Sequence, residues 1–234
     1  MAPTRPLALL FDLDGTLADS IGLLLDSFHH AFATCGIRPP SDEQWIAGIG
    51  TPLVAQMRSH VADDAMVAAL LEAYRTHQRA HHDHLLREFP AARETLQLLK
   101  ARGHPTALVT SKSNELAHRS LAALQMTALM DAVVGFDSCE RHKPDREPVE
   151  LALRTLGAAA SDAVFIGDSP HDITAGNAAG VMTIAALWGP FPRAVVEAAH
   201  PTYMLHDIRA LPPLIAELGA ANGGGSSRQE GQAG

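Results

Sequence analysis

The sequence predicts an α/β fold, in which a parallel β-sheet is covered by helices and a helical subdomain is inserted near the beginning of the chain. Three observations support this prediction. Short apolar runs alternate with segments of helical periodicity. This alternation is typical of parallel sheets in which helices connect successive strands. The interval between the first two runs is far longer than one crossover needs. Acidic and hydroxyl residues follow several runs, at the strand ends where open parallel sheets bind ligands.

Five apolar runs are predicted to form the strands of this sheet. They are residues 7–11 (LALLF), 106–110 (TALVT), 131–135 (DAVVG), 163–167 (AVFIG) and 182–186 (MTIAA). The segments between them, such as 91–102 and 148–156, are predicted to be crossover helices. The second of these begins at Pro148, which suits the first turn of a helix, and ends at Gly157, which suits a helix C-terminus.

The long interval after the first run is predicted to be a helical insertion. Asp19 or Ser20 can cap its first helix and Gly36 can end it, and the apolar residues between them recur at helical spacing: Ile21, Leu24, Leu25, Phe28 and Phe32. Two further helical stretches complete the insertion, residues 41–58 and 63–87.

These patterns define the expected domains. The core consists of residues 1–15 and 90–220, and the helical insertion of residues 16–89. Residues 221–234 contain mainly glycine and polar residues without an apolar period, so they are expected to form a disordered tail.

Composition excludes several classes of function. The 234 residues, 47% of them hydrophobic, suffice for a large buried core, whereas a net charge of −8 without a basic block argues against nucleic acid as a partner. Cys35 and Cys139 are far apart and match no metal or redox spacing, which favours a reducing compartment. No stretch is long enough to span a bilayer, and the first apolar run is too short for a signal peptide. We therefore expect a cytoplasmic protein, monomeric or homodimeric, that does not bind membranes.

Polar residues at successive strand ends predict one shared site. Asp12 and Asp14 follow the first run, while Lys143 lies in the loop before the helix that starts at Pro148. The other candidates follow the second and fourth runs: Thr110, Ser111, Lys112, Asp168 and Asp172. Because the carboxyl ends of parallel strands meet at one edge of the sheet, we expect these side chains to converge.

The four acids of this site predict a divalent cation. Two carboxylates about 4 Å apart repel by roughly 4 kcal/mol at an effective dielectric constant near 20, and four carboxylates (−4) with one lysine (+1) leave a formal charge of −3. Ligands that are all oxygen favour Mg²⁺ over zinc. Gly15 and Gly167 permit close backbone approach, and amides of the turn after Asp12 can hold phosphate oxygens. The combination predicts phosphate chemistry.

Four ordered motifs carry a family resemblance. The segments DLDGT, VTSK, KP and GDSPHD resemble, in order and spacing, the motifs of the haloacid dehalogenase-like superfamily, and most closely its phosphoglycolate phosphatase-like members. The resemblance implies a Rossmann-like core and a helical cap inserted after the first motif. It also implies that Asp12 is a nucleophile forming a phosphoaspartate, that Asp14 is the general acid and base, and that Thr110 and Lys143 hold the phosphoryl oxygens.

The same resemblance implies the ligands of Mg²⁺ and of a small phosphorylated metabolite. The metal ligands are Asp12, the backbone carbonyl of Asp14, Asp168, and Asp172 either directly or through water. Substrate contacts are expected from residues after the first and second strands and from the cap segment GIGTPL, which faces the site in relatives: Gly15, Thr16, Ser111, Lys112, Gly50 and Thr51.

The second acid selects a branch of the superfamily. Dehalogenating members lack an acid two residues after the nucleophile, so Asp14 favours a phosphatase. No lysine occurs between residues 16 and 99, which disfavours relatives that use a cap lysine as a Schiff base. The leading hypothesis is a Mg²⁺-dependent phosphatase for a metabolite such as 2-phosphoglycolate. A pyrophosphatase, a sugar phosphatase and a phosphomutase remain as alternatives, whereas a non-catalytic phosphate-binding module has no need of Asp14.

A histidine-rich segment, THQRAHHDH, places His77 and His81 one helical turn apart. This spacing permits metal binding, but no third ligand can be identified from the sequence, so a solvated helix face is the favoured interpretation.

Overall fold

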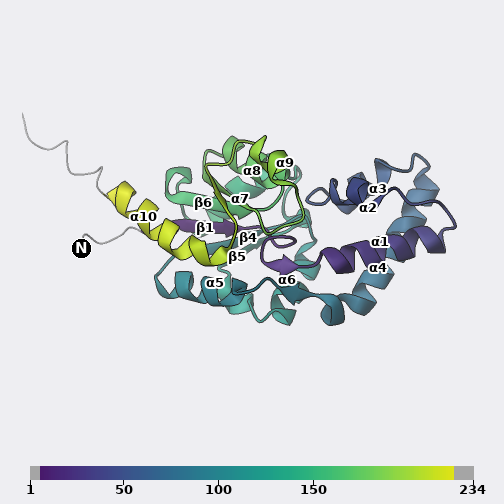
Figure 1. Cartoon of the computed structure of the whole chain (residues 1–234), viewed down its shortest axis with the longest axis horizontal. Coiled ribbons are helices and arrows are strands. Elements are labelled where there is room, and N and C mark those ends of the chain that lie inside the picture. The colour runs from purple at the N-terminus through teal and green to yellow at the C-terminus, as the bar shows by residue number, and fades with distance from the viewer. Residues whose placement is uncertain (1–5, 224–234) are drawn as a thin grey trace, which may run out of the picture.

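The computed structural model describes residues 6–223, and a six-stranded parallel sheet forms its core (Figure 1). The strand order is β5-β4-β1-β6-β7-β8, and every neighbouring pair is parallel. The strands are β1 (Ala8–Phe11), β4 (Thr106–Val109), β5 (Ala132–Val134), β6 (Ala163–Gly167), β7 (Met182–Ala186) and β8 (Tyr203–Leu205). All five predicted runs form strands, and β8 is an additional edge strand that the sequence did not indicate.

Helices cover both faces of the sheet, because successive apolar side chains of β1 point to opposite faces and both must be buried. Leu9 and Phe11 belong to one apolar cluster, which includes residues of α5, α6 and α10, whereas Leu10 belongs to another, with residues of α7 and α8. The core helices are α5 (Ala92–Ala101), α6 (Asn114–Ala123), α7 (Glu147–Leu156), α8 (Pro170–Ala178), α9 (Arg193–Glu197) and α10 (Leu211–Gly223). Short 3₁₀ turns complete the core: η1 (Thr127–Leu129), η2 (Phe136–Ser138), η3 (Ala160–Asp162) and η4 (Ile208–Ala210).

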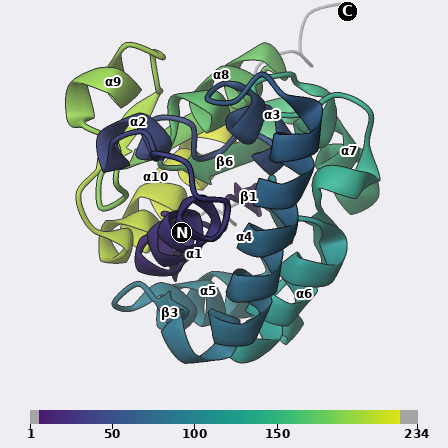
Figure 2. The ribbon, with the colours of Figure 1, turned by 90° about the vertical axis from the view of Figure 1, so that its right-hand side faces the viewer.

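The predicted helical insertion forms a cap at the carboxyl ends of the strands, and its helices lie in front of the sheet in Figure 2. Its helices are α1 (Ile21–Thr34), α2 (Asp42–Ile46), α3 (Leu53–Arg58) and α4 (Asp64–Leu85). An aromatic cluster forms the interior of the cap, where the Phe28 and Trp45 rings stack with their centroids 4.4 Å apart. The same cluster includes buried residues of the core subdomain, so the apolar interior of the cap is continuous with the core: Ile173, Ala185, Phe191 and Val196.

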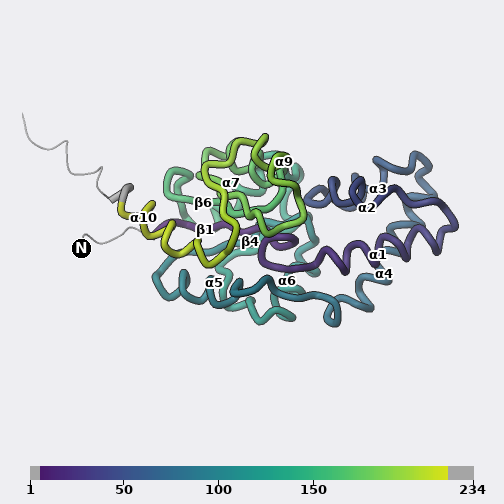
Figure 3. The backbone as a smooth tube through the Cα atoms, in the orientation of Figure 1, coloured from purple at the N-terminus to yellow at the C-terminus, as the bar shows by residue number. Residues whose placement is uncertain are grey.

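Two short antiparallel strands join the cap to the core. Ala18 of β2 (Ala18–Asp19) pairs with Glu88 of β3 (Arg87–Glu88), so the outgoing and returning chains lie side by side where they cross (Figure 3). The predicted boundaries of the insertion, residues 16 and 89, lie just outside this pair. The two chain crossings between the subdomains are therefore adjacent.

The end of the chain is described only in part. Helix α10 continues to Gly223, so the backbone of the first residues of the predicted tail is helical, and residues 224–234 lie outside the described part of the structure. Among residues 6–223, no helix combines the length and the apolar character that crossing a membrane requires.

Candidate active site

The carboxyl ends of β1, β4 and β6 bring the predicted site residues together. Asp12 follows β1, where its backbone N–H donates to the Ile166 carbonyl at 2.9 Å, and Thr110 follows β4, where its N–H donates to the Val134 carbonyl at 2.9 Å. Asp168 follows β6 directly. The sheet itself thus positions these three side chains, and all three are buried.

Lys143 lies at the centre of the site and is 3% exposed. Its ammonium group donates to Asp12 Oδ1 and Asp172 Oδ1, each at 2.6 Å, and to the Val109 carbonyl at 3.1 Å. One buried cation therefore holds two carboxylates that come from different motifs of the sequence.

Three of the four predicted acids form a compact group. One carboxylate oxygen from each of Asp12, Asp168 and Asp172 lies within 4.8 Å of the others, and all three residues are buried. Asp168 Oδ1 accepts a hydrogen bond from the Thr16 hydroxyl at 2.8 Å, but its Oδ2 is buried without a hydrogen-bond partner. The three carboxylates (−3) and Lys143 (+1) leave a charge of −2.

Burial and mutual repulsion perturb these acids. Burial raises the pKa of Asp12 to about 7; the charge of Lys143 opposes this rise, and those of Asp172 and Asp14 add to it. Burial also raises the pKa of Asp168, with contributions from the charges of Asp172 and Asp12. The carboxylates of Asp12 and Asp172 raise the pKa of Lys143 against the effect of its burial. The group is thus short of positive charge.

The residues present fit a hard dication. All donors are oxygen atoms, one buried carboxylate oxygen lacks a partner, and the residual charge of −2 matches one Mg²⁺. Gly15 has φ +87°, and a Cβ added there would lie 2.3 Å from Asp168 Oδ2, so a side chain at this position would occupy the space beside that oxygen. The site is consistent with the metal centre predicted from the acids.

The carboxylate of Asp14 lies apart from this group. Its Oδ1 accepts a hydrogen bond from the Ser20 hydroxyl and forms an ion pair with the Lys112 ammonium. The two charged side chains are 13% and 7% exposed, respectively. Lys112, predicted to contact substrate, is therefore the charge partner of the predicted general acid, while the proposed role of the Asp14 carbonyl stays a prediction.

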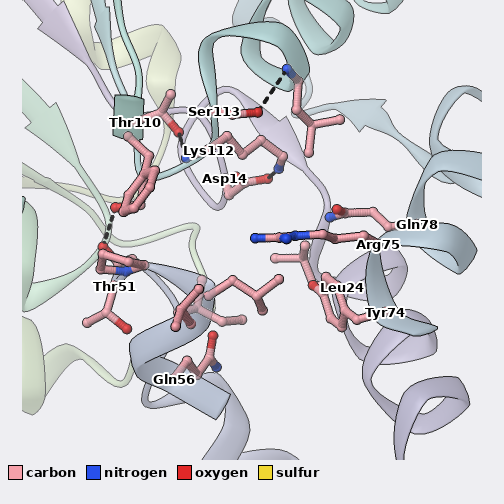
Figure 4. Close-up of a pocket in the computed structure, with 18 of the residues that line it drawn as sticks. Asp14, Leu24, Thr51, Gln56, Tyr74, Arg75, Gln78, Thr110, Lys112 and Ser113 are labelled. Carbon is pink, nitrogen blue, oxygen red and sulfur yellow. Dashed lines mark hydrogen bonds and ion pairs between the residues drawn. The ribbon is translucent and has the colours of Figure 1, made fainter. Parts of the chain in front are cut away.

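A cavity of about 220 Å³ lies between the core and the cap. The core contributes Asp12, Asp14 and Thr110 to its wall, and the cap contributes Gly50 and Thr51, with further residues shown in Figure 4. The predicted sites on the two subdomains therefore face one space. Its size suits a small ligand rather than a polymer.

The cap segment that includes Gly50 and Thr51 contacts the core directly. The Ser111 hydroxyl donates to the Gly50 carbonyl at 2.6 Å, across the boundary between the subdomains. The Thr51 hydroxyl donates to the Gly48 carbonyl at 2.7 Å, within its own turn. Both predicted hydroxyl contacts are engaged with protein, and a contact with substrate stays a prediction for Ser111 and Thr51.

Sequence reasoning missed the part of α4 that lines the cavity, which includes Arg75, Gln78 and Arg79. Their spacing places them on one helix face, but the histidines between and beyond them suggested a solvated surface. His77 Nε2–H instead donates to Asp26 Oδ2 of α1 at 2.7 Å. Among residues 6–223, the geometry expected of a metal site occurs at Asp12, Asp168 and Asp172, not at the histidines.

Comparison with known proteins agrees with this fold. A model of the haloacid dehalogenase-like hydrolase family matches residues 9–186. The chain belongs to this family of hydrolytic enzymes, as its four motifs predicted, and is an enzyme of its hydrolase and phosphatase class.

Individual relatives define the similarity further. Pyrophosphatase PpaX of Bacillus cereus strain AH820 is 35% identical over 209 residues, covering 89% of this chain and 96% of the relative. PpaX of Bacillus thuringiensis strain Al Hakam is 34% identical with the same coverage. A solved structure described as a predicted phosphoglycolate phosphatase from Haemophilus somnus 129pt superposes with a TM-score of 0.83 at 22% identity, covering 89% of this chain and 97% of that one. At this identity the structural likeness establishes the fold alone.

Proposed function

We propose that this protein is a Mg²⁺-dependent phosphatase that hydrolyses inorganic pyrophosphate through a phosphoaspartate. The observation that carries the proposal is the buried arrangement of Asp12, Lys143 and Asp172, which opens onto a small cavity that also contains Asp14. The choice of substrate is supported by relatives named pyrophosphatase at 35% identity over 89% of the chain. This support favours pyrophosphate over 2-phosphoglycolate, the substrate first expected.

In the first step, a carboxylate oxygen of Asp12 attacks one phosphorus atom and the bridging P–O bond breaks. Lys143 holds Asp12 Oδ1, so the other oxygen of this carboxylate is available for attack. Asp14 gives a proton to the bridging oxygen as the second phosphate leaves. Thr110 and Lys143 stabilise the charge on the oxygens of the transferred phosphoryl group.

In the second step, Asp14 removes a proton from water, which attacks the phosphorus of the phosphoaspartate and releases phosphate and the free carboxylate of Asp12. Because the ion pair with Lys112 holds Asp14 at the cavity wall, the same carboxyl group can serve both displacements. When held by Asp12, Asp168 and Asp172, Mg²⁺ would supply positive charge against the charge that develops on the phosphoryl oxygens.

A panel of phosphorylated substrates tests the proposal. Phosphate release is measured with Mg²⁺ from pyrophosphate, 2-phosphoglycolate and a hexose monophosphate, with Asp12→Asn as the control for contaminating activity. We expect kcat/KM for pyrophosphate to exceed that of the others by at least tenfold. A higher value for 2-phosphoglycolate or for the sugar phosphate would assign one of those substrates instead.

The same panel separates the remaining alternatives. A phosphomutase would isomerise the sugar phosphate without net release of phosphate, because its phosphoaspartate is shielded from water. A non-catalytic module would bind phosphate compounds without turnover of any of them. Either result would overturn the proposal of a hydrolase for pyrophosphate.

A further inference from the structure

Helix α4 of the cap brings unmatched positive charge to the cavity. Arg75 and Arg79 both line it, one helical turn apart, and the side chain of Arg75 points into the cavity (Figure 4). Both residues are solvent-accessible, and within residues 6–223 neither forms an ion pair. Guanidinium groups in this situation are free to bind an anion.

The other cations of the cavity wall are already paired. Lys112 forms its ion pair with Asp14, and Arg119 donates to both carboxylate oxygens of Asp83, each at 3.1 Å. Glu115 is an acidic residue of the same wall and is exposed. The two arginines of α4 are therefore the cations of this wall that no protein carboxylate neutralises.

The surroundings of Arg75 favour a fixed position for a bound anion. Tyr74 precedes it and is 3% exposed, and Gln78 is 5% exposed, so both side chains are packed into the cap while also lining the cavity. Trp45 adds apolar surface to the same wall. An ion pair beside such surface is screened less than one in open solvent.

We infer that Arg75, assisted by Arg79, binds an anionic group on the leaving part of the substrate. It thereby selects substrates that carry a second anionic group besides the transferred phosphoryl group. For pyrophosphate this group is the second phosphate; the inference rests on the proposed function and names a residue for its specificity. The guanidinium is planar and binds phosphate or carboxylate oxygens through two parallel N–H donors. Thr110 and Lys143 hold the transferred group at the core, while Arg75 approaches the leaving group from the cap.

Paired substrates test this inference. Arg75→Gln and Arg75→Lys are assayed with pyrophosphate, and with p-nitrophenyl phosphate, whose leaving group has no second anionic group. We expect Arg75→Gln to raise KM for pyrophosphate by roughly tenfold to a hundredfold, because the substitution removes charge-assisted hydrogen bonds to the second phosphate. KM for p-nitrophenyl phosphate should change by less than about twofold. Arg75→Lys should raise KM for pyrophosphate less than Arg75→Gln does, because lysine keeps the positive charge but lacks the two parallel N–H donors.

The matched control is Arg38→Gln, which removes the same charge from an exposed position of the cap that does not line the cavity. It should leave both KM values unchanged. Equal effects of Arg75→Gln on both substrates, or no effect on either, would overturn the inference.

Failure of the inference is distinguishable from failure of the proposed function. If the parent protein hydrolyses 2-phosphoglycolate but not pyrophosphate, the proposed substrate is wrong, and a selective loss for phosphoglycolate in Arg75→Gln still supports an anion site. Binding of Mg²⁺-pyrophosphate to Asp12→Asn, measured by calorimetry with and without Arg75→Gln, gives a readout without turnover. Affinity that does not depend on Arg75 would overturn the inference.

Discussion

Replacing Asp168 by Asn should stabilise the metal-free protein while removing its response to Mg²⁺. Asp168 is 1% exposed, lies within 4.8 Å of acidic oxygens of Asp12 and Asp172, and has one carboxylate oxygen without a partner. Asparagine has nearly the same shape and keeps an oxygen for the Thr16 hydroxyl, which donates at 2.8 Å. The substitution therefore removes charge with little change in packing.

The expected magnitude follows from Coulomb's law. At 4.8 Å and an effective dielectric constant near 20, two unit charges repel by about 3.5 kcal/mol. Lys143 offsets part of this repulsion, because its ammonium group donates to both Asp12 and Asp172. We expect a net gain of about 1 to 3 kcal/mol in the free energy of unfolding, which corresponds to a rise in Tm of roughly 3 to 10 °C for a chain of this size.

Thermal unfolding at pH 8.5, with EDTA or with excess Mg²⁺, measures both effects. This pH lies above the pKa of about 7 for Asp12, so that carboxylate is ionised. The parent protein should gain about 2.7 kcal/mol when Mg²⁺ is at a hundred times its Kd, and Asp168→Asn should gain much less. The exposed Asp64→Asn is the control for a lost charge, with little expected effect on either measurement.

One pattern of results would refute this reasoning. If Asp168→Asn were less stable than the parent in EDTA, repulsion among the acids would not destabilise the metal-free protein. If the variant still gained the full stabilisation from Mg²⁺, Asp168 would not be a metal ligand.

Three further predictions concern the acid, a buried histidine and the cap. Asp14→Asn should slow esters with poor leaving groups much more than an activated aryl phosphate, which departs with little protonation, and equal losses would contradict its role. Burial lowers the pKa of His82 below its usual 6.5, and its Nε2 lies 2.8 Å from Ser120 Oγ. Because the folded protein favours the neutral imidazole, the contribution of His82 to the free energy of unfolding is present above pH 6.5 and is lost as the pH falls. His82→Gln should flatten that part of the pH profile of unfolding, and an unchanged profile would reject the assignment. Gly50→Val should raise KM and reorder the substrate panel, because Gly50 has φ +95° and a Cβ there lies 3.1 Å from Ser169 Oγ, whereas an unchanged ranking would make the loop structural only.

Much of the core could be predicted because its signals are local. A short apolar run of about five residues between polar ones favours a buried strand, and the residue after such a strand lies at the carboxyl end of the sheet. This is why Asp12, Thr110 and Asp168 were identified as neighbours although β1 and β6 are separated by most of the chain. The long interval before the second run was likewise sufficient to predict the helical cap.

Features that depend on the packing of separate segments could not be predicted. The edge strand β8 has three residues, and β2 and β3 have two each, so their patterns are too short to distinguish from loops. Lys112 and Asp14 are 98 residues apart in sequence, and nothing local indicates that they form a pair. Arg75 belongs to a helix whose polar face is compatible with solvent, and it lines a cavity only because the cap docks over the strand ends. The sequence determines which side chains a helix carries, whereas the docking of that helix decides what they face.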